Sequence, residues 1–140
     1  MQHLKTLVIG DWNDVKAEGC RAIASLQRLE SLAMGAATGI QAEGCQHIST
    51  MQHFKTLKVG GYNAVKAEGC RAIASLQRFK SLEIGRENDI QADGCKEIAK
   101  LQQLRSLMVA KHLNDLGNGE EILRNNAWTH DCQVKLSGFG

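Results

Sequence analysis

A duplication of 50 residues is the feature that most limits what this chain can fold into. Residues 1–50 match residues 51–100 at 31 of 50 positions without a gap. Each half divides again into two units of 25 residues, because an apolar frame of the form L-x-x-L-x-I opens at five evenly spaced residues, Leu4, Leu29, Phe54, Phe79 and Leu104. Self-similarity at a period of about 20 to 50 residues is typical of repeat proteins, whose units bury a core only by stacking.

Each unit of 25 residues predicts one short strand followed by one short helix. In the first unit Leu7 and Ile9 alternate with polar or exposed positions, as in a strand with one buried face. After a loop that contains glycine, Cys20, Ile23 and Leu26 follow at three-residue spacing, which places them on one stripe of a helix. Because no single unit can bury both apolar surfaces, we expect the units to stack side by side.

The strand motif that opens at Leu4, followed by the helix motif G-C-R-A-I-A that opens at Gly19, resembles the repeat of the leucine-rich repeat family. The similarity is greatest to its helix-bearing ribonuclease-inhibitor-like and GALA-type branches, and it covers residues 1–116. It implies an α/β solenoid in the form of a horseshoe arc, with a parallel β-sheet on the concave face and α-helices on the convex face. We expect about five repeats in residues 1–116, followed in residues 117–140 by a fifth helix and a degenerate C-terminal cap.

The C-terminal prediction comes from counting 25 residues onward from Leu104. The count predicts the fifth helix at residues 120–125 and then a sixth strand that acts as the cap, with Trp128 over the last layer. The alternative is a disordered tail after residue 126. In this register the residues that face inward from the sixth strand are Cys132, Val134 and, beyond them, Leu136.

The N-terminal layer has no such cap in the sequence, because Met1 aligns with Met51 at the end of a helix. Terminal repeats need a polar outer face. We therefore expect either that the chain is a fragment of a longer array or that it covers its first layer by self-association.

The loops between strand and helix depart from the family pattern in one respect. The usual asparagine stands at the ninth repeat position, whereas Asn13, Asn63 and Asn88 stand at the tenth, which lengthens the loop by one residue. The second repeat has Thr38 at this place, and the fifth has Leu113 followed by Asn114. We therefore predict an incomplete ladder of hydrogen bonds from asparagine side chains to the backbone of neighbouring loops.

Candidate catalytic or metal-binding residues are few. One cysteine recurs in each of four helices, but stacked helices lie roughly 8 to 10 Å apart, beyond the limit of about 7 Å between Cα atoms for a disulfide. We interpret Cys20, Cys45, Cys70 and Cys95 as small buried residues, since they also lack the C-x-x-C spacing of zinc sites. A catalytic alternative is limited to the triple His130, Asp131 and Cys132. We predict no enzymatic activity, no cofactor and no metal.

Two sets of glycines recur with the same period. Gly10, Gly35, Gly60 and Gly85 end the strands and are interpreted as loop geometry, because they open no helix of a nucleotide-binding fold. The second set lies in the helices. We expect Gly69, as one of this set, where its helix closely approaches the sheet.

Charge and composition exclude other classes of protein. Lys and Arg number 17 against 15 Asp and Glu, so the net charge is +2 and the pI about 8.3, which favours neither nucleic acid nor an anionic membrane. The sequence contains no apolar run of about 18 residues and no signal peptide. With five cysteines expected to be free, this predicts a cytoplasmic location. The GALA resemblance leaves a secreted effector that acts in a host cytosol as an alternative.

We expect a protein partner to bind at the strand positions that point away from the core and in the loops that follow. Nine of the 19 differences between the halves fall there or just beyond, while Val15–Arg28 and Val65–Arg78 are identical. Tryptophan, tyrosine and methionine are enriched at protein interfaces. The predicted partner-binding residues are Val8, Asp11, Trp12, Ala33, Ala36, Lys58, Tyr62, Glu83, Arg86, Glu87, Met108 and Lys111, and Gln133 is expected to extend the strand column.

We therefore predict a non-enzymatic protein-binding module whose face buries on the order of 600 to 800 Å². The resemblance adds two alternatives, a ribonuclease-inhibitor-like enzyme inhibitor and a structural fragment of a longer protein of the bacterial-effector or ubiquitin-ligase-adaptor type. One further column, basic at four of five places, favours an acidic partner or is simply a solvated rim. It consists of Lys5, Glu30, Lys55, Lys80 and Arg105.

Overall fold

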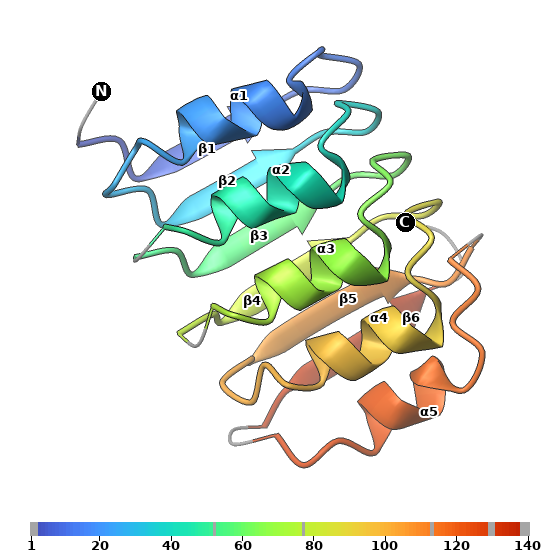
Figure 1. Cartoon of the computed structure of the whole chain (residues 1–140). Coiled ribbons are helices and arrows are strands. Elements are labelled where there is room, and N and C mark those ends of the chain that lie inside the picture. Colours follow the sequence, from blue (N-terminus) through green and yellow to red (C-terminus); the bar gives the residue numbers. More distant parts are fainter. Residues whose placement is uncertain (1–2, 52, 77, 113, 129–130, 138–140) are drawn as a thin grey trace.

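The computed structural model of the chain (Figure 1) describes residues 3–51, 53–76, 78–112, 114–128 and 131–137. It is an α/β repeat solenoid in which one open sheet of six parallel strands has the order β1-β2-β3-β4-β5-β6. The fold class expected from the sequence is therefore confirmed. The strands are β1 (Thr6–Ile9), β2 (Ser31–Met34), β3 (Thr56–Val59), β4 (Ser81–Ile84), β5 (Ser106–Ala110) and β6 (Gln133–Ser137).

A layer of helices covers one face of the sheet and leaves the other face open (Figure 1). The helices are α1 (Lys16–Ile23), α2 (Gln41–Ile48), α3 (Lys66–Ile73), α4 (Gln91–Ile98) and α5 (Gly119–Arg124). Neighbouring strands lie about 4.8 Å apart and packed helices about 8–10 Å apart, so the open sheet face is on the concave side.

Strand register follows the repeat of the sequence. Leu7 pairs with Leu32, and Leu32 with Leu57, so residues that are 25 apart are neighbours in the sheet. The inward column and the helix stripes enclose a continuous core in which Phe54 and Phe79 stack at 5.7 Å between ring centroids. The apolar alternation of each strand and the three-residue spacing of each helix thus meet in one layer between sheet and helices.

Close contacts between repeats require both sets of glycines. A Cβ atom on Gly60 would lie 2.5 Å from the backbone nitrogen of Ala36 in the preceding loop. A Cβ atom on Gly69 would lie 2.6 Å from Val65 Cγ1 and 3.2 Å from Cys45 Sγ of the preceding helix. The expectation that Gly69 approaches the sheet is therefore wrong, because its bare Cα faces the neighbouring helix.

A buried ladder of polar side chains connects the loops of repeats two to five. Asn63 Oδ1 accepts hydrogen bonds from the backbone N–H and the hydroxyl of Thr38, both at 2.8 Å. Asn88 Oδ1 accepts from the N–H of Asn63 at 3.1 Å, and Asn114 Oδ1 accepts from the N–H of Asn88 at 2.7 Å. The prediction of an incomplete ladder is wrong at the fifth repeat, because Asn114 takes the place expected for residue 113.

The C-terminal cap exists, but in a different register from the one predicted. Val134 pairs with Leu107 and Leu136 with Val109, so the inward residues are 27 and not 25 positions after their partners. Cys132 precedes the strand, and the prediction that it faces inward is wrong. The extra residues lie after α5, which is two residues shorter than α4. Trp128 is half-buried against the core, as expected for a residue over the last layer.

The first layer is less covered than the layers inside the stack. Leu4, Leu7, Ile9 and Val15 are only partly buried, although they pack against the core. The corresponding residues of the third repeat, Phe54, Leu57, Val59 and Val65, are each at most 1% exposed. β1 has a neighbouring strand on one side only, which explains the difference.

Candidate functional site

The open face of the sheet carries one column of outward side chains. Val8, Ala33, Lys58, Glu83 and Met108 are neighbours in register, as the repeat predicted. Lys58 Nζ lies 3.2 Å from Glu83 Oε2, so the middle of the column is a cross-strand ion pair. The column continues at Lys135, which pairs with Met108, and the expectation that Gln133 extends it is wrong because β6 is shifted by two residues.

The loop after each strand, which we call the ascending loop, adds the other predicted residues. The guanidinium of Arg86 lies 5.4 Å above the ring centroid of Tyr62, close enough for a cation–π contact between neighbouring loops. Asp11 Oδ1 accepts a hydrogen bond of 2.7 Å from the N–H of Ala36. Asp11 therefore links the first two loops, a role that the sequence analysis did not predict.

The exposed large apolar side chains among the described residues are Val8, Trp12 and Tyr62, with 72%, 79% and 46% of their surface exposed. All of them belong to the predicted partner-binding set, and the predicted polar residues Lys58 and Lys111 are exposed too. The other predicted residues are only partly exposed: Ala33, Ala36, Glu83, Arg86, Glu87 and Met108. We call the column and the ascending loops together the recognition face.

The backbone of the ascending loops is held in an unusual conformation. Trp12, Ala37, Tyr62 and Glu87 occupy the same loop position and have φ angles of 61°, 54°, 58° and 55°. A left-handed conformation costs a non-glycine residue roughly 1–2 kcal/mol, so neighbouring structure must stabilise it. Their N–H groups supply that stabilisation, since they donate to the next loop at Ala36 O, Gly61 O, Arg86 O and His112 O.

A second row of left-handed residues stands at the start of each helix. Lys16, Gln41, Lys66 and Gln91 have φ angles between 55° and 60°. Their N–H groups donate to the backbone carbonyls of the ladder residues of the next repeat, Thr38, Asn63, Asn88 and Asn114, at 2.8 to 2.9 Å. The recognition face is therefore mounted on loops whose backbones are hydrogen-bonded from repeat to repeat, and this signal was not visible in the sequence.

The buried cysteines have the properties of inert side chains. Cys20, Cys45, Cys70 and Cys95 are 0% exposed and free. Burial raises the pKa of the Cys20 thiol to about 11 and that of Cys45 to about 12, so both thiols are protonated at neutral pH. Protonated thiols are poor nucleophiles and poor metal ligands.

The remaining chemical candidates offer no assembled centre within the described part of the chain. Among those residues, no group of three or more His, Cys, Asp and Glu side chains is placed to hold a metal ion. Of the triple at 130–132, His130 lies outside the described residues, and burial raises the pKa of the Cys132 thiol. Nor does any helix of the described ranges have the length and apolar character needed to cross a bilayer.

Comparisons with known proteins add no identity to this geometry. The sequence matches no protein-family model and no curated protein. Function is therefore argued below from the recognition face itself.

Proposed function

We propose that this chain is a non-enzymatic scaffold of the leucine-rich repeat type that binds a protein partner through its recognition face. The observation that carries the proposal is the coincidence of the exposed large apolar residues, Val8, Trp12 and Tyr62, with the outward column and ascending loops. Exposed tryptophan and tyrosine are the side chains that most often dominate binding energy at protein interfaces.

The distribution of chemistry along the face suggests how a partner would be oriented. The first repeat contributes the apolar pair Val8 and Trp12, whereas the centre carries the ion pair of Lys58 and Glu83. A partner that buries an apolar side chain against Trp12 and offers polar groups to the centre fits this arrangement. Because the loops are already held by inter-repeat hydrogen bonds, little conformational entropy is lost on binding.

The experiment that tests the proposal uses Trp12 as both anchor and reporter. The wild-type protein and a Trp12→Ala, Tyr62→Ala variant are immobilised and used to enrich proteins from a lysate. Loss of a hot-spot residue typically costs 2 kcal/mol or more, so we expect a partner's affinity to fall by at least about 30-fold in the variant. The isolated partner should then shift the emission of Trp12 to shorter wavelength, measured in a Trp128→Phe background.

A matched control keeps the interpretation specific. Arg21→Ala, Glu68→Ala changes two exposed helix residues on the opposite side of the sheet and should retain the partner. Equal loss of the partner in both variants, with circular dichroism showing both folded, would contradict the proposed face. Binding of the chain to itself through the first layer is the alternative that sedimentation of the wild-type protein alone distinguishes.

A further inference from the structure

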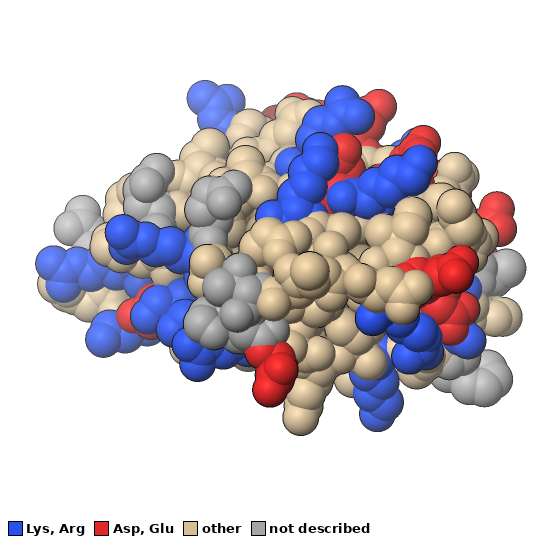
Figure 2. Space-filling view, turned by 90° about the horizontal axis from the view of Figure 1, so that it is seen from below, with Lys and Arg blue, Asp and Glu red and all other residues tan. Residues whose placement is uncertain are grey.

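The edge of the sheet opposite the ascending loops concentrates positive charge. We define the descending edge as the segments that lead from each helix to the next strand, residues 3–5, 24–30, 49–55, 74–80, 99–105 and 125–132. These segments hold seven Lys and Arg and two acidic residues, a charge of +5 in a chain whose total is +2. Figure 2 looks at the C-terminal end of the stack and shows Lys and Arg gathered at its left, where these loops lie in Figure 1.

Most of these cations have no internal partner. Lys55 Nζ lies 3.4 Å from Glu30, and Lys100 Nζ lies 2.8 Å from Glu97. Lys5, Arg78, Lys80 and Arg105 are exposed and form no ion pair with another described residue. Four like charges along one edge repel each other, which a structural role does not explain.

The helix ends at this edge do not explain the cations either. Basic residues often bind the last carbonyls of a helix. Here those carbonyls already accept hydrogen bonds from hydroxyls: Ser25 donates to Ala22 O at 2.6 Å, and Ser75 to Ala72 O at 2.7 Å. Ser49 and Thr50 do the same at the end of α2, both at 2.7 Å. The guanidinium and ammonium groups of the edge therefore remain available to a ligand.

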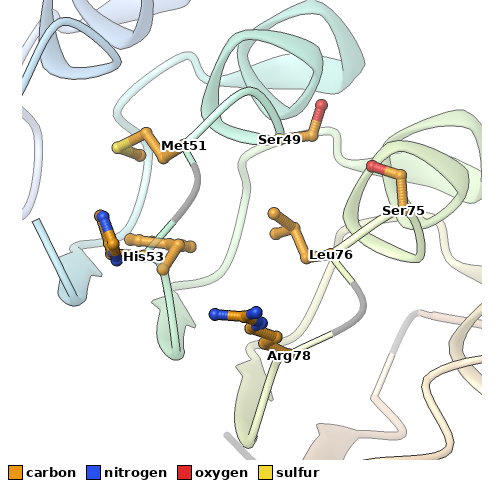
Figure 3. Close-up of a pocket in the computed structure, with 7 residues that line it drawn as sticks. Ser49, Met51, His53, Ser75, Leu76 and Arg78 are labelled. Atoms are coloured by element: carbon orange, nitrogen blue, oxygen red, sulfur yellow. The ribbon is translucent and has the colours of Figure 1, made fainter. Parts of the chain in front are cut away.

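The descending edge also contains a hollow with an apolar floor. Its volume is about 420 Å³, and its lining comes from the loops that follow α2 and α3 (Figure 3). Met51, Phe54 and Leu76 are buried residues of this lining, while His53 and Arg78 are exposed at its rim. One repeat earlier, a second hollow of about 340 Å³ is lined by Lys5, Arg28, Glu30 and His53. His53 thus borders both hollows.

We propose that the descending edge binds an extended acidic segment of a protein partner, with one apolar side chain of that segment in the hollow beside Arg78. Carboxylates at intervals along an extended chain would meet the cations that follow one another from repeat to repeat. The apolar floor favours a peptide over a nucleic acid, because the exposed aromatic side chains, Trp12 and Tyr62, lie on the recognition face and none of those described lies here for bases to stack on. The proposal shares no residue with the recognition face and does not depend on it.

The test uses two fluorescein-labelled peptides, Asp-Glu-Asp-Glu-Leu-Glu-Asp-Glu-Asp and the same sequence with serine for leucine. Fluorescence anisotropy at an ionic strength on the order of 50 mM should show binding of both, tighter for the leucine peptide and weaker as salt is added. Reversing three free cations, in Arg78→Glu, Lys80→Glu, Arg105→Glu, should weaken binding by at least about tenfold.

Two further variants separate charge from the hollow. Arg21→Glu, Lys66→Glu, Lys96→Glu makes the same change in net charge on the helix side and should alter affinity less than about twofold. Ser75→Trp fills the hollow without changing charge and should remove the preference for leucine. The proposal is wrong if neither peptide binds, if the two triple variants lose affinity equally, or if a single-stranded oligonucleotide of equal charge binds more tightly.

Discussion

The first and third repeats have nearly the same scaffold and different surroundings. Residues 15–28 and 65–78 are identical, yet Val15 is partly exposed where Val65 is 0% exposed. The third repeat has a strand and a helix on both sides, whereas the first has them on one side. Identical residues therefore contribute differently to stability, since burial in this architecture depends on the neighbours and not on the unit itself.

The polar ladder gives the largest expected difference between the two repeats. Asn63 accepts from Thr38 and donates to the carbonyls of Gly35 and Gly60 at 3.0 Å. Asn13 is exposed, and its amide donates to Gly10 O within its own loop. Asn63→Ala leaves several buried polar groups without partners and should lower the free energy of unfolding by about 3 kcal/mol, against less than about 1 kcal/mol for Asn13→Ala.

Urea denaturation followed by circular dichroism measures both values on the same protein. Asn63→Asp serves as the control, because it keeps the acceptor for Thr38 and removes the donor to Gly35 and Gly60. Its loss should fall between those of the two alanine variants. Equal losses for Asn13→Ala and Asn63→Ala would mean that the ladder does not connect the repeats.

The helix glycines give the next largest difference. A Cβ on Gly69 meets both Val65 of its own helix and Cys45 of the preceding one, whereas a Cβ on Gly19 meets Val15 alone. Val15 lies in the open first layer and has room to move. We expect Gly69→Val to cost about 2–3 kcal/mol and Gly19→Val about 1 kcal/mol, judged by melting temperature and urea midpoint. A larger loss at Gly19 would contradict this account of the helix contacts.

The periodic part of the fold could be predicted because each repeat states it again. Strand, loop and helix recur at the same spacing from Leu4 to Leu104, so the parallel sheet and its register follow from the pairing of equivalent residues. The prediction went wrong where the period changes. The two extra residues before β6 leave no apolar signal of their own, and the register of Val134 was therefore counted two residues early.

The candidate surfaces were predictable only as far as they follow strand alternation. Val8 and Lys58 point outward because their neighbours in the sequence point inward. The bond from Ala36 N–H to Asp11 and the left-handed backbone at Trp12 arise between repeats, where a single sequence carries no distance information. The hollow at Arg78 is formed by two loops whose shapes depend on packing, so the basic column alone could not reveal it.

Alkaline pH offers a smaller test of burial inside the stack. Burial raises the pKa of Cys45 to about 12, from an ordinary value of 9.0 in the unfolded chain. Because the folded-state pKa is the higher one, its contribution to stability is complete below pH 9 and is lost as the pH rises from 9 toward 12. Between pH 8 and 10 this thiol should account for a loss of about 1.3 kcal/mol.

The measurement compares urea midpoints at the two pH values for wild type and Cys45→Ala. The variant should lose about 1.3 kcal/mol less than wild type over this range, whatever its stability at pH 8. Cys132→Ala, which removes a half-buried thiol outside the helices, should change the slope less. Parallel pH profiles for wild type and Cys45→Ala would show that this thiol is not shielded from water.

The loop backbone gives the smallest difference, and its sign is opposite in the two repeats. Ala64 has a φ of 51°, whereas its equivalent in the first repeat, Asp14, is not among the residues with positive φ. Glycine relieves a left-handed alanine of roughly 1 kcal/mol or more and costs about 0.4–1 kcal/mol in the entropy of the unfolded chain. Ala64→Gly should therefore raise stability by about 0.5 kcal/mol, while Asp14→Gly should lower it by a similar amount.

The second repeat supplies the reciprocal control for this last comparison, because Gly39 already occupies the position with a φ of 75°. A Cβ there would lie 3.3 Å from Lys16 Cγ, a flexible side chain that can move. Gly39→Ala should thus lose about as much as Ala64→Gly gains, in melting temperature by circular dichroism. If both substitutions destabilise the protein, the left-handed conformation is held so firmly by the hydrogen bonds between loops that relief of its strain is not recovered as stability. The repeats would then be coupled more tightly than their separate contacts indicate.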